Sequence, residues 1–114
     1  MKYIISVLFI IFSAFIVSAQ NSEVKTETFK VAGNCSMCKK RIEDAAYIKG
    51  VKRAEWNKET KELTLTYNSS KTSSETVLQS IAKAGHASEK VTAKEEDYNR
   101  LPGCCQYNTN SCND

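Results

Sequence analysis

Two cysteines separated by two residues are the groups in this chain best placed to do chemistry. Cys35 and Cys38 follow a strand-like stretch that ends at Gly33, and Cys38 opens a helix-like pattern. Two thiols at this spacing, at the junction between a loop and a helix, can bring both sulfurs to one point. The N–H groups at a helix N-terminus favour negative charge, so thiolates form more easily there. Thiolates bind soft metals or exchange disulfides, and either chemistry fits this pair.

The chain begins with a segment typical of a secretory signal peptide, residues 1–19. Lys2 supplies a positive start, an almost wholly apolar run extends from Ile4 to Val17, and the small residue Ala19 precedes Gln20. This run is shorter than the roughly 20 residues that a membrane-spanning helix needs. We therefore expect cleavage after Ala19, export to the periplasm or the outside, and no stable membrane insertion afterwards.

Composition limits the partners and the compartment. The 114 residues carry 16 basic and 13 acidic side chains, and these charges are interspersed along the chain, so no basic stripe for nucleic acid is present. Export implies an oxidising compartment, in which cysteines tend to pair. The five cysteines are an odd number, so at least one thiol stays unpaired, binds metal or pairs between chains.

The hydrophobic pattern predicts an α+β domain behind the cysteine pair. Alternating residues favour strands at 26–31, 51–56 and 63–67 and a weak fourth strand at 88–93, while helical spacing follows Ser36 and Thr72. This βαββαβ order matches the ferredoxin-like sandwich, in which two helices cover one face of a four-stranded antiparallel sheet. We expect a linker at 20–23, the domain at 24–93 and a cysteine-bearing tail at 94–114. The predicted inward-facing residues are Phe29, Val31, Ile42, Ala45, Ala46, Ile48, Ala54, Trp56, Leu63, Leu65, Tyr67, Val77, Leu78, Ile81 and Ala82.

The motif G-x-C-x-x-C between a strand and a helix, in this order of elements, resembles the heavy-metal-associated (HMA) domain family. That family includes copper chaperones, periplasmic mercury-binding proteins and soluble domains of metal-pumping P-type ATPases. The resemblance covers about Val24 to Ala93, and Ile42-Glu43, Gly50-Val51 and the run 81–85 support it. One departure is Gly33, which stands where the family usually carries a methionine beneath the loop.

The resemblance implies a non-enzymatic protein in which Cys35 and Cys38 bind one soft ion. The ion would be Cu(I), alternatively Hg(II) or Zn(II), and the partner a metal-transporting membrane protein or another metal-binding domain. His86, the only histidine, follows the end of the second helix, where some relatives place a metal-facing histidine. It is either a third ligand or an ordinary loop residue.

The tail holds three more cysteines, Cys104, Cys105 and Cys112. Cys104 or Cys105 could form a disulfide with Cys112, since adjacent cysteines do not easily bridge each other. Alternatively, Cys104-Cys105 folds back to the first pair or makes a second soft-metal site. Met37 is interpreted as packing or contact surface rather than as a ligand.

A thiol–disulfide oxidoreductase that uses Cys35 and Cys38 is the competing function. The pair stands after a strand and at a helix start, which also suits redox chemistry. Against it, the aromatic residue and the proline that usually surround a redox C-x-x-C are absent, and the only proline is Pro102. A structural zinc module is less favoured, because zinc in such sites takes four ligands and the other candidates lie far along the chain.

Overall fold

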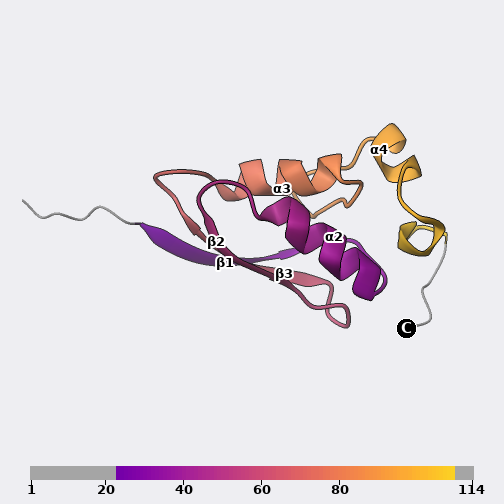
Figure 1. Ribbon diagram of the computed structural model, residues 1–114, viewed down its shortest axis with the longest axis horizontal. Coiled ribbons are helices and arrows are strands. Elements are labelled where there is room, and N and C mark those ends of the chain that lie inside the picture. Colours follow the sequence, from indigo (N-terminus) through magenta and orange to yellow (C-terminus); the bar gives the residue numbers. More distant parts are fainter. Residues whose placement is uncertain (1–22, 110–114) are drawn as a thin grey trace, which may run out of the picture.

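The computed structural model describes residues 23–109 of the 114-residue chain. The predicted signal peptide, most of the predicted linker and Cys112 lie outside the described residues. The described residues form a sheet of three antiparallel strands, β1(Val24–Lys30), β2(Val51–Trp56) and β3(Glu62–Asn68), in the order β1-β3-β2. The two main helices, α2(Ser36–Ala46) and α3(Ser74–Lys83), pack against each other and lie on one face of the sheet (Figure 1).

The residues on the inner face of the sheet are those that the alternating hydrophobic pattern predicted. Leu63, Leu65 and Tyr67 of β3 are buried at every second position, between Phe29 of β1 and Trp56 of β2. Leu63 pairs with both of these neighbours across the two antiparallel registers. This row stabilises the fold because each large apolar side chain contributes about 1.5–3 kcal/mol when it is fully buried.

Helix α2 carries the second cysteine on its buried face. Cys38, Ile42 and Ala46 recur every fourth position and are each completely buried. Side chains four residues apart stack on one face of a helix, so the apolar stripe that packs on the sheet also holds the Cys38 thiol in the interior.

Helix α3 is capped by a side chain one residue after Thr72, the N-cap of the capping-box pattern Thr72-Ser73-Ser74-Glu75. The Ser73 hydroxyl caps it by accepting a hydrogen bond from the Thr76 N–H at 3.2 Å. Its buried residues are the predicted Val77, Leu78, Ile81 and Ala82. The helix is therefore anchored by one capped end and one continuous apolar face.

The predicted fourth strand, residues 88–93, is not formed in the described structure. Ser88 makes a single bridge with Val31, and the Glu89 N–H donates to the Lys30 carbonyl at 3.1 Å. The Ser88 N–H then donates to the Val91 carbonyl at 2.9 Å, which closes a turn and takes the chain off the sheet edge. Val91 is the only large apolar residue of this segment, so no inward row exists to hold it against the sheet.

The C-terminal segment packs onto the domain. It forms the short helix α4(Glu95–Asn99) and the 3₁₀ helix η2(Gly103–Cys105), and η2 lies beside the start of α2 (Figure 1). Leu101 and Cys105 are buried in the same core as the sheet residues. The tail has too few apolar residues to fold alone, and it becomes ordered by using the core of the domain.

Candidate metal centre

Cys35 and Cys38 converge because one precedes the helix and the other lies in its first turn. Cys35 is the N-cap of α2, with an extended backbone at φ −144°, and Cys38 is the third residue of the helix. Their Sγ atoms are 3.9 Å apart. The two sulfurs are therefore held at a common point, as their spacing predicted.

Cys105 brings a third sulfur to this point. The Sγ atoms of Cys35, Cys38 and Cys105 all lie within 4.8 Å of one another, and all three residues are buried. An ion bonded to three sulfurs in one plane, at about 2.3 Å from each, requires the sulfurs to be about 4 Å apart. The cluster of Cys35, Cys38 and Cys105, here called the inner cluster, fits such an ion.

The redox state of the cysteines decides when the inner cluster can bind. Cys35 is disulfide-bonded in this structure, whereas Cys38, Cys104 and Cys105 carry thiols. The predicted disulfide from Cys104 or Cys105 is therefore not formed. Because a sulfur in a disulfide is not a thiolate, the inner cluster becomes a three-thiolate site only after Cys35 is reduced.

Because Cys105 is buried, a metal ion has to compete with a proton for its sulfur. Burial raises the pKa of the Cys105 thiol far above its usual range, and the neighbouring Cys38 thiol raises it further. Cys105 is thus protonated at neutral pH, and a metal ion must displace this proton when it binds. Only an ion with a strong preference for thiolate makes that exchange favourable.

Two groups of contacts hold the tail over the cysteine loop. The Asn34 side chain donates from Nδ2 to the Cys104 carbonyl at 3.3 Å, which joins the loop directly to the tail. The Tyr107 hydroxyl donates to the Gly85 carbonyl at 2.9 Å and accepts from the Ala87 N–H at 3.1 Å. Cys105 is therefore placed by packing and by hydrogen bonds on both sides of it.

The Trp56 side chain packs so close to position 33 that only glycine fits there without displacing a neighbour. A Cβ atom on Gly33 would lie 2.9 Å and 3.0 Å from two atoms of the Trp56 indole and 3.1 Å from Ile42. The indole is itself fixed, because Nε1 donates to the Val31 carbonyl at 3.0 Å. Trp56 thus fills the space beneath the cysteine loop, where the resemblance led us to expect a methionine.

His86 lies in the interior but is not part of the inner cluster. It is completely buried, its Nδ1 donates to the Ala32 carbonyl at 2.8 Å, and its ring stacks on Tyr107 with centroids 5.8 Å apart. Its Nε2 has no hydrogen-bond partner within residues 23–109. Burial lowers the pKa of His86, and the charge of Arg41 lowers it further, so the imidazole is neutral near pH 7.

We expect the folded protein to lose stability below about pH 6.5, the usual pKa of histidine. The unfolded chain takes up a proton on His86 there, whereas the folded chain does not, so acid favours unfolding by up to about 1.4 kcal/mol per pH unit. Urea unfolding of the reduced protein at pH 7.5 and 5.5 measures this loss. His86 is the only histidine, so His86→Gln should remove most of the difference. Equal unfolding midpoints at the two pH values would contradict this expectation.

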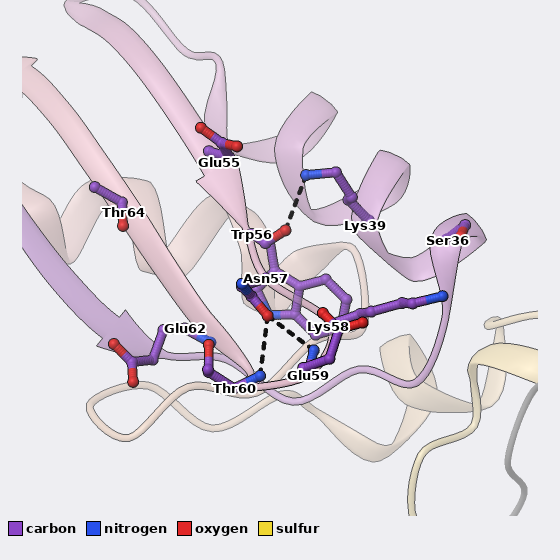
Figure 2. A pocket seen from close by; sticks show the side chains of 10 residues that line it. All are labelled: Ser36, Lys39, Glu55, Trp56, Asn57, Lys58, Glu59, Thr60, Glu62 and Thr64. Carbon is purple, nitrogen blue, oxygen red and sulfur yellow. Dashed lines mark hydrogen bonds between the residues drawn. The ribbon is translucent and has the colours of Figure 1, made fainter.

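A polar pocket lies beside the cysteine loop, between the start of α2 and the β2–β3 hairpin (Figure 2). Figure 2 shows the Lys39 Nζ donating to the Trp56 carbonyl, at 2.9 Å, and the Asn57 side chain accepting from two backbone N–H groups of the hairpin. The described residues that line it include no cysteine or histidine, so this pocket is separate from the inner cluster. The lining residues are Ser36, Lys39, Glu55, Trp56, Asn57, Lys58, Glu59, Thr60, Glu62 and Thr64.

Solved structures of a metallochaperone and of two copper-related proteins have a similar fold. A CopZ metallochaperone is 29% identical and matches with a TM-score of 0.54, covering 56% of this chain and 98% of its own. The copper form of a single-residue variant of CopA from Bacillus subtilis is also 29% identical, with a TM-score of 0.51, covering 59% of this chain and 91% of its own. A putative copper-ion-binding protein from Bacillus anthracis, 20% identical, matches with a TM-score of 0.57 over 60% of this chain and 99% of its own. Each match leaves about two-fifths of this chain unaligned.

Two sequence-based comparisons add no relative. A scan against models of protein families finds no match, and a search of curated proteins finds none either. Among the described residues, no helix is both long enough and apolar enough to cross a membrane.

The structure and these similarities confirm the predicted resemblance at the level of the fold. The chain has a heavy-metal-associated, copper-chaperone-like fold, and the CopZ metallochaperone that it resembles is a metal-binding protein rather than an enzyme. The similarity to CopZ and the cluster of three cysteines together support binding of a soft metal. Cys105 is the candidate ligand that the sequence could not distinguish from Cys104, because the tail has no periodic pattern from which its path could be derived.

Proposed function

We propose that the protein, once reduced, binds one Cu(I) ion through Cys35, Cys38 and Cys105 and passes it to another protein. The observation that carries this proposal is the inner cluster, in which three buried sulfurs lie within 4.8 Å of one another. Thiolates are the ligands that soft ions prefer, and three of them suit a planar site. The similarities to a CopZ metallochaperone and to the copper form of a CopA variant support copper as the cargo.

The number of available ligands favours Cu(I) over Zn(II) as the bound ion. Zinc in structural sites almost always has four protein ligands. Within the described part of the chain, the group of histidine, cysteine and acidic side chains that could hold an ion has three members, all cysteines. Three sulfurs favour Cu(I) over Zn(II), and Hg(II) is the alternative cargo because it has the same preference for thiolates.

Burial of the thiols counts against the alternative function as a thiol–disulfide oxidoreductase. Such an enzyme needs a thiolate that a substrate disulfide can reach. Cys38 and Cys105 are completely buried, and the pKa of Cys105 is raised rather than lowered. Both properties suit a site that holds an ion better than one that attacks a substrate.

We also propose that the protein is exported and that it exchanges its ion with a partner protein. The signal-peptide pattern at residues 1–19 supports export to the periplasm or the outside. There, Cys35 must be kept reduced for the protein to take up its cargo. The partner would be a metal-transporting membrane protein or another metal-binding domain, since a Cu(I) ion moves between proteins by exchange of thiolate ligands.

Replacing Cys105 by serine tests whether the third sulfur binds the ion. We expect Cys105→Ser still to bind one Cu(I), but with an affinity at least ten- to a hundredfold lower, since loss of a residue that merely supports a ligand has roughly that effect. Competition against a chromophoric Cu(I) chelator, with fully reduced protein, measures this affinity. Cys104→Ser is the matched control and should keep the wild-type affinity. Equal affinities for Cys105→Ser and wild type would overturn the three-sulfur site.

A further inference from the structure

Burial of the inner cluster creates a problem for transfer of its ion. Cys35 is 3% exposed, and Cys38 and Cys105 are not exposed at all. A C-x-x-C pair on an open loop would let a partner thiolate attack the ion directly. In this structure the tail covers the pair, so an ion needs another way to reach the surface.

Two further sulfurs lie between the inner cluster and solvent. The Sγ atom of Cys104 is 4.0 Å from the Sγ atom of Cys105 and 3.5 Å from the Sδ atom of Met37. Cys104 is partly exposed, and Met37 is half exposed, one of the few large apolar side chains on the described surface. These two residues therefore extend the inner cluster into a continuous series of sulfur atoms from the core to the surface.

The geometry points to a second soft-metal site, made by the Met37 thioether and the Cys104 thiolate, through which Cu(I) enters and leaves the inner cluster. This inference rests on the proposed function, because it gives the inner cluster its route of exchange. A thioether and a thiolate are both soft ligands, and a thioether binds weakly enough to release the ion again.

The transfer is an exchange of ligands with no change of oxidation state. Cys104 gives its proton to solvent and forms a Cu–S bond, and Met37 completes the outer site. A Cu–S bond to Cys105 then forms as the bond to Met37 breaks, and Cys105 releases its proton. Bonds to Cys38 and Cys35 form next, with loss of their protons, as the bond to Cys104 breaks and Cys104 takes up a proton again. The ion leaves by the same steps in reverse, with a partner thiolate replacing Met37.

Stopped-flow kinetics of Cu(I) transfer test this route. The reduced protein, loaded with one Cu(I), is mixed with a chromophoric Cu(I) chelator, and the reverse transfer is followed from the chelator complex to metal-free protein. We expect Met37→Leu and Cys104→Ser to slow both directions by about tenfold, because exchange at sulfur depends on access to an attacking sulfur. Their equilibrium affinities should stay close to that of the wild type. Cys104→Met, which keeps a soft sulfur at this position, should restore the fast transfer.

The outcomes separate this inference from the proposed function. A wild-type protein that binds no Cu(I) overturns both. A wild-type protein that binds one ion, with variants that transfer it at the wild-type rate, overturns the outer site alone. Variants that lose Cu(I) affinity while uptake stays fast would show that Met37 and Cys104 only support the structure, and would overturn the outer site. A Cys104→Met variant that transfers the ion as slowly as Cys104→Ser would overturn it as well.

Discussion

The double variant Cys35→Ser, Cys38→Ser is expected to lose stoichiometric Cu(I) binding. It keeps Cys105 as the only sulfur of the inner cluster, and serine hydroxyls are poor ligands for a soft ion. Structural thiolate sites bind their metal with about 10–16 kcal/mol, so loss of two of three ligands should weaken binding by at least roughly a thousandfold. Copper analysis of the reduced protein after gel filtration measures the effect directly.

The control for this prediction is the single variant Cys104→Ser, which removes one thiol but leaves the inner cluster intact. It should retain one Cu(I) per chain. If the double variant also retains one tightly bound ion, the ion binds elsewhere and the inner cluster is not the metal site.

Replacing Gly85 by alanine is expected to destabilise the fold and to displace the tail. Gly85 has φ +102°, and a Cβ atom there would lie 2.7 Å from Leu101 Cγ and 2.8 Å from the Asp97 carbonyl oxygen. The left-handed backbone costs a residue with a Cβ roughly 1–2 kcal/mol, and overpacking adds about 1–3 kcal/mol. We expect a loss of about 2–5 kcal/mol in the free energy of unfolding, measured by urea denaturation.

The same substitution should also weaken metal binding, because Leu101 shortly precedes Cys105 and is buried in the same core. We expect the Cu(I) affinity of Gly85→Ala to fall as it does for Cys105→Ser. Gly103→Ala is the matched control, since a Cβ there has no atom within 4 Å and no strained backbone. It should change stability by less than about 0.5 kcal/mol. A Gly85→Ala protein with wild-type stability and affinity would show that the tail is not held by this contact.

Most of the fold could be predicted because its core consists of periodic patterns. The row of Leu63, Leu65 and Tyr67 and the buried face of α3 recur at the spacings of a strand and a helix, and the structure confirms both. The prediction of a fourth strand was wrong because its alternation was weak. Val91 alone could not outweigh the hydrogen bonds that close the turn from Ser88.

The candidate site could be predicted only where it depends on local sequence. The spacing of Cys35 and Cys38 on either side of a helix start is enough to bring their sulfurs together. The position of Cys105 depends instead on contacts made across the fold, such as that from Asn34 to Cys104. The packing of Trp56 beneath Gly33 likewise joins residues on different elements, which a pattern in one segment cannot reveal.

X-ray absorption spectroscopy of the reduced, Cu(I)-loaded protein tests the central claim most directly, because it counts the sulfur atoms bound to copper. With one ion per chain, the inner cluster predicts three sulfur ligands in the wild type and two in Cys105→Ser. Two sulfur ligands in both proteins would contradict the proposed site, since Cys105 would then lie beside the ion without binding it.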